Sequence, residues 1–431
     1  MKLLIIWILS AIVTMSYGIH LKTLYEWKYV NFTWDPSQKE QMENSSYYDP
    51  MECALYDVDK APDGRYFVTA VRGKGVPASL MTVTDQTGEG GPLLRPYPDW
   101  SWYQTTNCLE NHIISVFRVY IKCNYIFVLD CGKSELDASG LTTVCPPQLL
   151  IFNLKSDSLV KKIEIPEEYV SKNDSLLTTP TVKVKNCYKI SDAMVSLADT
   201  GSFGLLTIQL KSWEMSNICR VESEDMKPTE PEFTIDDESF YLNDGILGMT
   251  YMSECHHNHN SDLYYSPLAG NAIFKMDGYK LKSCSGFKKS NDQLVTTLSG
   301  QTGPMASKGS IIFFSNIPKT AIMCMDTSEK RNANKTDVVV QDAVNLQFTS
   351  GMKINEELHN KTRKEEQHKC TKICSGELNV MTNRYQKIAN HDMNMNETNF
   401  RVMRMDVKEI CENTNCFESY NSWHNHHTKH H

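Results

Sequence analysis

The hydrophobic residues of this 431-residue chain are grouped in short runs of about five to seven residues, rich in Ile, Val, Phe and Tyr. Within a run they alternate with polar residues or follow one another directly, and turn residues separate the runs. These are the patterns of half-buried and fully buried strands. No stretch shows an amphipathic helical pattern of comparable strength, so the sequence predicts an all-β protein.

The runs come in six pairs. The pairs are 66–71 with 78–83, 125–129 with 148–154, 194–198 with 204–210, 263–267 with 272–276, 310–314 with 321–325, and 377–381 with 400–405. They recur about every 50 to 70 residues, which leaves room for two more strands and a long loop in each interval. A four-stranded sheet repeated around an axis is a β-propeller blade, and neighbouring blades bury each other's faces. We predict a single six-bladed β-propeller with these pairs as its inner strands. The alternative is a large β-sandwich or two β-domains.

Residues 1–18 have the layout of a secretory signal peptide. Lys2 precedes an apolar run over residues 3–13 that is too short to span a bilayer, and small residues follow it. We predict cleavage after about Gly18, and therefore a secreted, extracellular protein. An N-terminal anchor or a buried core helix is the alternative interpretation.

The remaining chain is predicted to form one propeller domain over residues 19–420, followed by a His-rich disordered tail over 421–431. Without the signal peptide it carries 43 basic and 52 acidic side chains, for a net charge of about −9. This charge argues against nucleic acid or an anionic membrane surface as a partner.

Cysteines and glycosylation sequons agree with an extracellular location. The chain holds 14 cysteines, which in a secreted protein are interpreted first as disulfides. Six asparagines begin N-x-Ser/Thr sequons and are the predicted glycosylation sites, although we do not expect all to be used: Asn31, Asn44, Asn173, Asn334, Asn360 and Asn396.

Four residues are candidates for binding a small ligand. Asp130 and Asp199 each begin an Asp-x-Gly turn after the first run of a pair. Turn chemistry explains them, and the functional alternative places their carboxylates at the mouth of the propeller channel. Trp100 and Trp102 lie in the aromatic segment 97–103, which suits stacking on an aromatic or sterol ligand. The other interpretation is a Pro-rich loop packed over a propeller face.

Catalytic and metal-binding signatures are weak. The chain contains no G-x-S-x-G, H-E-x-x-H, P-loop or dinucleotide motif, so we predict no catalytic residue and no cofactor. Histidines gather at 255–259 and 424–431, but both segments are polar, so we expect solvated clusters and predict no metal site. His112, between Cys108 and Cys123, is the candidate for a buried general base, and a packed or exposed histidine is the alternative.

Several segments resemble the yellow and major royal jelly protein family, and they follow in the family's order. These are LYEWKY at 24–29, GVPASL at 75–80, GGPLLRPYPDWSW at 90–102, the strand 123–132, DGILGMT at 244–250, LYYSP at 263–267 and NRYQKIA at 383–389. The resemblance covers nearly the whole mature chain and is closer to the royal jelly branch. It implies an insect source, secretion and a six-bladed propeller. Ile126-Phe127 and Met325-Asp326 depart from the family pattern.

The resemblance also bears on the cysteines. Six lie at or near family positions: Cys108, Cys123, Cys145, Cys187, Cys324 and Cys411. The other eight look additional and would suffice for four further bridges. We predict that Cys108 pairs with Cys123, because both match family positions and their separation suits a strand-to-strand clip. Cys145 with Cys187, and Cys324 with Cys411 or Cys416, are the further expected pairs.

The function implied by the resemblance is that of a non-enzymatic glandular or nutritive protein, oligomeric in some members and able to carry a small apolar molecule. One alternative is a dopachrome-converting enzyme, as in some yellow relatives. Another is a propeller that binds a biogenic amine or a sterol in its channel, with Asp130 or Asp199 supplying the charge for the amine. We expect the purified protein not to turn over dopachrome at an enzymatic rate.

Overall fold

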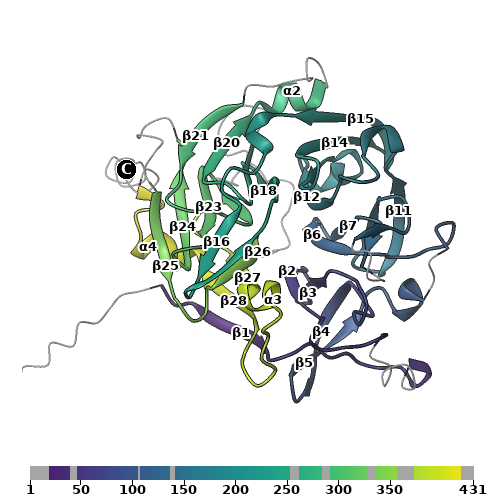
Figure 1. Ribbon diagram of the computed structural model, residues 1–431. Helices are drawn as coiled ribbons and strands as arrows, with labels where there is room; N and C mark the ends of the chain where they lie inside the picture. Colours follow the sequence, from purple (N-terminus) through teal and green to yellow (C-terminus); the bar gives the residue numbers. More distant parts are fainter. Residues whose placement is uncertain are drawn as a thin grey trace, which may run out of the picture.

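The computed structural model describes residues 19–38, 46–104, 107–135, 141–252, 262–283, 292–328, 336–356 and 373–418. Within these residues, six four-stranded antiparallel sheets stand around a common axis (Figure 1). The predicted six-bladed β-propeller is therefore confirmed. The predicted signal peptide and the His-rich tail lie outside the described residues.

Each blade is built from four strands that follow one another along the chain, with two exceptions: the β8–β9 hairpin interrupts blade 2, and the last blade includes the N-terminal strand. Blade 1 holds β2 (Leu55–Lys60), β3 (Tyr66–Ala70), β4 (Leu80–Gly88) and β5 (Gly91–Pro96). Blade 2 holds β6 (Val116–Lys122), β7 (Tyr125–Asp130), β10 (Gln148–Asn153) and β11 (Ser158–Glu164). Blade 3 holds β12 (Leu177–Lys183), β13 (Met194–Asp199), β14 (Gly204–Lys211) and β15 (Glu214–Glu222).

Blade 4 holds β18 (Ile246–Tyr251), β19 (Leu263–Pro267), β20 (Ala272–Met276) and β21 (Gln293–Thr297). Blade 5 holds β22 (Met305–Lys308), β23 (Ile311–Asn316), β24 (Ala321–Asp326) and β25 (Thr336–Gln341). Blade 6 holds β26 (Phe348–Asn355), β27 (Glu377–Asn383), β28 (Phe400–Asp406) and the N-terminal strand β1 (Lys22–Trp27).

Two features close the ring. The strand β1 pairs antiparallel with β28, with Trp27 opposite Phe400, so that the two ends of the described chain share one blade (Figure 1). The first strands of the blades also contact one another in a complete circuit, in the order β2, β6, β12, β18, β22, β26 and back to β2. Closure of this kind leaves no blade face uncovered.

The paired apolar runs are the second and third strands of each blade, so the prediction that they are the inner strands is wrong. A middle strand has a neighbour on each edge and a blade on each face, and β13 and β23 are accordingly buried along their whole length. The innermost strands carry polar side chains instead, such as Asp57 in β2 and Lys353 in β26. Continuous hydrophobicity therefore marks the middle of a blade, not its channel edge.

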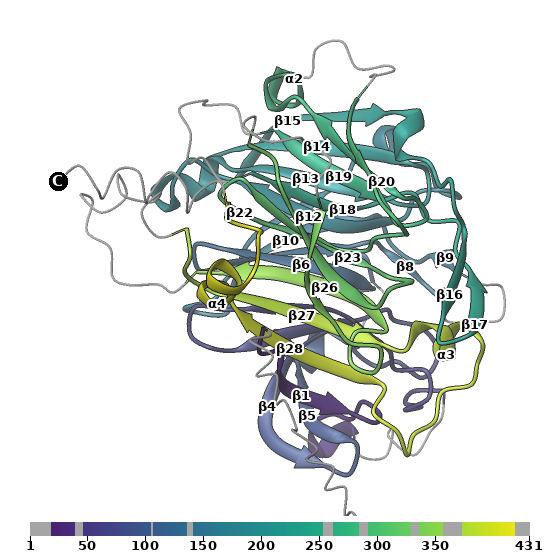
Figure 2. The same cartoon turned by 90° about the vertical axis from the view of Figure 1, so that its left-hand side faces the viewer.

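The remaining elements cover the two faces of the ring. The hairpins β8 (Lys133–Ser134) with β9 (Thr142–Thr143) and β16 (Glu232–Ile235) with β17 (Glu238–Tyr241) lie on one face, together with α3 (Tyr385–Ala389). Helix α4 (Val407–Asn413) lies on the opposite face (Figure 2). The other short elements are η1 (Pro36–Gln38), η2 (Trp100–Tyr103), η3 (Glu167–Tyr169), η4 (Cys187–Asp192), η5 (Glu224–Met226) and α2 (Gly278–Ser283). None of the helices in the described part of the chain has the length and apolar character that crossing a membrane requires.

Four disulfides connect described cysteines. They are Cys108–Cys145, Cys123–Cys187, Cys324–Cys416 and Cys374–Cys411. The Cys324–Cys416 pair, one of two expected for Cys324, is confirmed. The predicted pairs Cys108–Cys123 and Cys145–Cys187 are wrong, as is Cys324–Cys411.

The error over Cys108 has a geometric cause. Cys108 precedes β6 and Cys123 follows it, and a strand of seven residues is roughly 23 Å long. A disulfide requires α-carbons less than about 7 Å apart. The segment holding Cys145 precedes β10, which runs parallel to β6 with the antiparallel strand β7 between them. Cys145 therefore lies at the same end of blade 2 as Cys108.

The additional cysteines do not all form bridges. Cys53 and Cys131 are free and buried, whereas Cys219 and Cys374 are disulfide-bonded. Cys255, Cys284 and Cys370 lie outside the described residues. An even number of cysteines therefore did not imply complete pairing.

Candidate functional site

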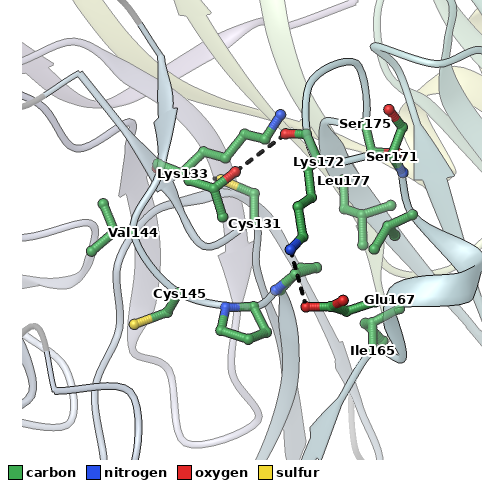
Figure 3. A pocket seen from close by; sticks show the side chains of 14 residues that line it. Cys131, Lys133, Val144, Cys145, Ile165, Glu167, Ser171, Lys172, Ser175 and Leu177 are labelled. Atoms are coloured by element: carbon green, nitrogen blue, oxygen red, sulfur yellow. Dashed lines mark hydrogen bonds and ion pairs between the residues drawn. The ribbon is translucent and has the colours of Figure 1, made fainter.

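A cavity of about 300 Å³ lies between blades 2 and 3, beside the β8–β9 hairpin (Figure 3). Its walls come from the end of β7, the segment before β10, η3 and the loop that leads into β12. The lining residues are Cys131, Lys133, Thr143, Val144, Cys145, Pro146, Pro147, Ile165, Glu167, Val170, Ser171, Lys172, Ser175 and Leu177. This volume is at the lower end of the range for ligand pockets, so the cavity suits a small ligand.

The first wall depends on a turn that only glycine permits. Gly132 has a φ of +67°, and a Cβ placed there would lie 2.0 Å from the carbonyl oxygen of Cys145. The backbone N–H groups of Val144 and Cys145 both donate to the carbonyl of Gly132. This close approach brings Cys131 and the segment before β10 together as one surface. Pro146 and Pro147 have no backbone N–H, and the strand β10 begins only after them.

The second wall uses its hydroxyl groups to hold its own loop. The Ser175 hydroxyl donates to Asp199 and accepts from the backbone N–H of Ser171. The Ser171 hydroxyl donates to Asp174, and Thr143 Oγ1 donates to the carbonyl of Lys172 at 3.3 Å (Figure 3). These lining hydroxyls are therefore already engaged within the protein.

The charged groups of the cavity differ in their surroundings. Lys172 and Glu167 form an exposed ion pair at the rim, with 3.5 Å between nitrogen and oxygen. Lys133 is buried at 7% exposure, and its ammonium donates to the carbonyl of Asn173 at 3.1 Å. Burial, with the nearby charge of Asp130, raises the pKa of the Cys131 thiol to about 12. The thiol is thus protonated at neutral pH and is not a nucleophile.

The predicted residue Asp130 lies behind the first wall and not at an open channel mouth. Its carboxylate is 0% exposed. It accepts hydrogen bonds from the backbone N–H groups of Ile114, Ser115 and Gly132 and from the amide of Gln148. Its role is to hold the turn after β7.

Asp199 occupies the equivalent position in blade 3 and is also 0% exposed. It accepts from the hydroxyls of Ser175 and Ser202, both at 2.6 Å, and from Arg220 at 2.8 Å. Burial alone would raise the pKa of Asp199, but these hydrogen bonds and the guanidinium charge lower it below the ordinary value. The hypothesis of two carboxylates at the channel mouth is therefore wrong, because both are consumed by the turns that they stabilise.

The two predicted tryptophans are packed in the core. Trp100 stacks on Trp34, with ring centroids 5.1 Å apart, and donates from Nε1 to the carbonyl of Thr33. Trp102 meets Phe152 edge to face, with ring centroids 5.1 Å apart. Neither tryptophan lines the cavity.

His112 is packed as well. Its ring is within hydrogen-bond distance of the Glu110 carbonyl, 2.8 Å from Nδ1, and its exposure is 2%. Nε2 is buried and has no hydrogen-bond partner among the described residues. Both histidine clusters lie outside the described residues, and the part of the chain that the structure describes contains no group of three metal-ligating side chains.

Three of the predicted glycosylation sites can be placed. Asn173 and Asn396 are exposed, whereas Asn31 is half-buried. The side-chain oxygen of Asn31 accepts from the backbone of Phe32 and from the indole of Trp34. The other three sequons, at Asn44, Asn334 and Asn360, lie outside the described residues.

Sequence reasoning missed a cluster of buried charges on the innermost strands. Asp57 is fully buried, pairs with Lys353 through both oxygens at 2.8 Å, and accepts from the backbone N–H of Val119. These contacts connect β2, β26 and β6. The alternation LYDVDK in β2, with acids at every second position, was the signal for polar groups on an inner strand.

Asp59, two residues further along β2, makes a similar connection. It accepts from the backbone N–H of Ile121 at 2.7 Å and from the amide of Asn355 at 2.9 Å. Burial raises the pKa of Asp59 to about 6, although the charge of Lys353 acts in the opposite direction.

Asp244, before β18, differs from these two carboxylates. It is half-buried, and it forms no ion pair within the part of the chain that the structure describes. Burial raises the pKa of Asp244 to about 6, and the charge of Arg118 opposes this rise. Tyr56 and Tyr385 lie within electrostatic range of it, and their rings are 6.4 Å apart.

Comparison with known proteins assigns the family. The family model described as "Major royal jelly protein" matches residues 114–416. This chain belongs to the major royal jelly protein family. Major royal jelly protein 7 from Apis mellifera is 33% identical over 406 residues, which cover 92% of this chain and 87% of that protein. Major royal jelly protein 2 from the same species is 32% identical, covering 92% of this chain and 85% of that protein.

The family model spans the strands from β6 to β28, and the royal jelly relatives cover more than 90% of the chain. Major royal jelly protein 9 from Apis mellifera is 30% identical over 403 residues, covering 91% and 89% of the two chains. Among solved structures, virginiamycin B lyase from Staphylococcus aureus matches with a TM-score of 0.38 at 10% identity, covering 79% of this chain and 94% of that chain. The fold assignment of this family member rests on the ring of six sheets described above.

Proposed function

We propose that this royal jelly family protein is secreted, is not an enzyme, and carries a small molecule. The observation that carries the proposal is the cavity of about 300 Å³ between blades 2 and 3. Six of its fourteen lining residues are aliphatic or proline, and its hydroxyls are engaged within the protein. A concave apolar site with few free polar groups is typical of ligand binding.

Secretion is supported by two independent features. Residues 1–18 have the signal-peptide layout. The disulfides Cys123–Cys187 and Cys324–Cys416 each connect one blade with an element of the next, and bridges of this kind persist in oxidising compartments. The names of the relatives place those proteins in royal jelly.

A non-enzymatic role is supported by the state of the groups that chemistry would need. A general base must reach its substrate, and His112 is enclosed in the core. The Cys131 thiol is protonated, and Asp130 and Asp199 are saturated with hydrogen bonds. We expect no saturable acceleration of dopachrome decay in the presence of a metal chelator. Acceleration that survives chelation and disappears in His112→Ala would contradict the non-enzymatic proposal.

Native mass spectrometry of the protein purified from its source tests the carrier role. The expected result is a non-covalent adduct of small-molecule mass that is lost on denaturation. The same spectra report glycan mass and oligomeric state. Native protein whose mass equals that of the denatured glycoprotein would contradict the carrier proposal.

A second candidate, amine binding, is favoured by Asp244. A half-buried carboxylate near two tyrosine rings has the elements of an amine site. The charge of Arg118 works against a cationic ligand there. If this candidate is correct, Asp244→Asn weakens binding of an aromatic amine such as serotonin at least tenfold, and Asp237→Asn, on the exposed β16–β17 turn, leaves it unchanged. Equal binding by wild type and Asp244→Asn would remove the candidate.

A further inference from the structure

Three cationic side chains are buried in the described part of the chain: Arg118, Lys133 and Lys308, at 5%, 7% and 7% exposure. Lys308 forms an ion pair with Glu356 at 3.2 Å. Arg118 donates to the carbonyl of Ser350 at 2.7 Å and lies in the field of Asp57 and Asp244. Lys133 is the exception, because it forms no ion pair with a carboxylate of the described residues and donates to a backbone carbonyl instead.

The ammonium of Lys133 has three N–H donors, and one is used, toward the carbonyl of Asn173 at 3.1 Å. The nearby Cys131 thiol is protonated and supplies no negative charge. Glu167 lies at the exposed rim, paired with Lys172. Charges removed from water are normally paired, because an isolated one is costly. Within the described residues, nothing on the cavity wall provides the partner.

The surroundings of this ammonium define the missing partner. Lys133 extends along one side of the cavity (Figure 3). The lining also includes the apolar side chains of Pro146, Pro147, Ile165 and Val170. One cation in an apolar enclosure matches one anion attached to an apolar body. A ligand amine would meet the like charge of Lys133, and a phosphate dianion would meet only half of the charge that it needs.

We propose that the cavity between blades 2 and 3 binds a small apolar carboxylate. The carboxylate pairs with Lys133, and the hydrocarbon part lies against the prolines, Ile165 and Val170. This inference rests on the carrier function proposed above and specifies the class of molecule carried. It places the ligand between two blades and not in the central channel.

The test uses the full secreted chain, with its disulfides intact, and two probes of equal length: octanoate and octan-1-ol. Isothermal titration at neutral pH is expected to show one octanoate site, with octan-1-ol at least tenfold weaker. Lys133→Met is expected to weaken octanoate at least tenfold and to leave octan-1-ol unchanged. Lys211→Met, at the exposed end of β14 and outside the cavity lining, is the matched control and is expected to keep wild-type affinity for both.

Two results would overturn the proposal. One is equal affinity of the wild type for the acid and the alcohol, which needs no variant and therefore holds even if Lys133→Met is not secreted. The other is octanoate binding that Lys133→Met leaves unchanged. The outcomes also separate this inference from the carrier function. A source-purified protein that carries a molecule without a carboxylate supports the carrier and refutes the inference, whereas one that carries no molecule refutes the carrier.

Discussion

Buried charges occur both at the channel edge of blades 1, 2 and 6 and at the cavity between blades 2 and 3. The two regions differ in the hydrogen-bond and ion-pair partners of these charges. On the channel edge, Asp57 pairs with Lys353, and Asp59 is held by the amide of Asn355. At the cavity, Lys133 has a single carbonyl partner. The channel edge is built from the innermost strands β2, β6 and β26, whereas the cavity is lined mainly by segments that connect strands of blades 2 and 3.

The difference separates two uses of a buried charge. On the edge of β6 that does not pair with β7, the backbone N–H groups of Val119 and Ile121 donate to the carboxylates of Asp57 and Asp59 in β2. These carboxylates thus accept the backbone hydrogen bonds that a neighbouring strand would otherwise accept. The ammonium of Lys133 donates to a loop carbonyl and satisfies no strand edge, and Lys133 lines the cavity. Removing a channel carboxylate should therefore lower the stability of the fold. Removing the Lys133 ammonium should weaken ligand binding and change stability little.

The largest effect is expected for Asp57→Ala. It leaves the mostly buried Lys353 without its partner, which costs about 3–5 kcal/mol of unfolding free energy. Urea denaturation of the purified chain measures it. Asp63→Ala, which removes an exposed ion pair with Arg65, is the control and should cost less than about 1 kcal/mol. Equal costs for the two variants would show that burial of the channel pair is irrelevant to stability.

Asp199→Ala is expected to cost about 2–3 kcal/mol at neutral pH, because two hydroxyls and Arg220 lose their acceptor. The folded-state pKa of Asp199 is lowered. Its contribution is therefore present above the ordinary value of about 3.9 and is lost as pH falls through the folded-state value. Denaturation from pH 7 to 3 should show the wild-type advantage shrinking only at the acid end. An advantage that is constant with pH would contradict the electrostatic account.

Asp59→Asn is expected to show the opposite pH dependence. Burial raises the folded-state pKa of Asp59 to about 6, so between about pH 4 and 6 the folded protein binds more protons than the unfolded chain. Wild-type stability should fall across this window as pH rises, by roughly 1–2 kcal/mol relative to the variant. Parallel stability curves for wild type and Asp59→Asn would show that the carboxylate is not destabilised by burial.

Lys133→Met is expected to have the smallest effect, a change of less than about 1 kcal/mol or a gain, because it removes a buried charge that no described carboxylate pairs with. Lys353→Met is the matched comparison and should be clearly destabilising, since it strands Asp57. Thermal unfolding without added ligand compares the two methionine variants. If they were equally destabilised, the distinction between channel and cavity would fail.

The strand content and the number of blades could be predicted from the chain, because a middle strand needs apolar side chains on both faces and so shows a strong local pattern. The closure of blade 6 through β1 could not be predicted. The run 22–27 has mixed burial, and its partner strand β28 lies at the other end of the chain. The pairing of Cys108 also failed, because it depends on which ends of β6 and β10 lie together. The family itself was recognisable from sequence and is shown by the comparisons.

Part of the candidate site could likewise be predicted from the sequence, and part could not. The Asp-x-Gly motifs at Asp130 and Asp199 were visible in the sequence, but only the fold shows that Ile114 and Ser175, distant along the chain, use up their oxygens. The cavity was invisible, because its lining residues come from three separate stretches of the chain, 131–133, 143–147 and 165–177.

The sequence by itself determined the all-β class, the six repeats and the signal-peptide pattern, since each is a local property of consecutive residues. The tertiary structure alone decided which charges are paired, which cysteines meet and where space remains. Those outcomes depend on distances between segments that only ring closure brings together.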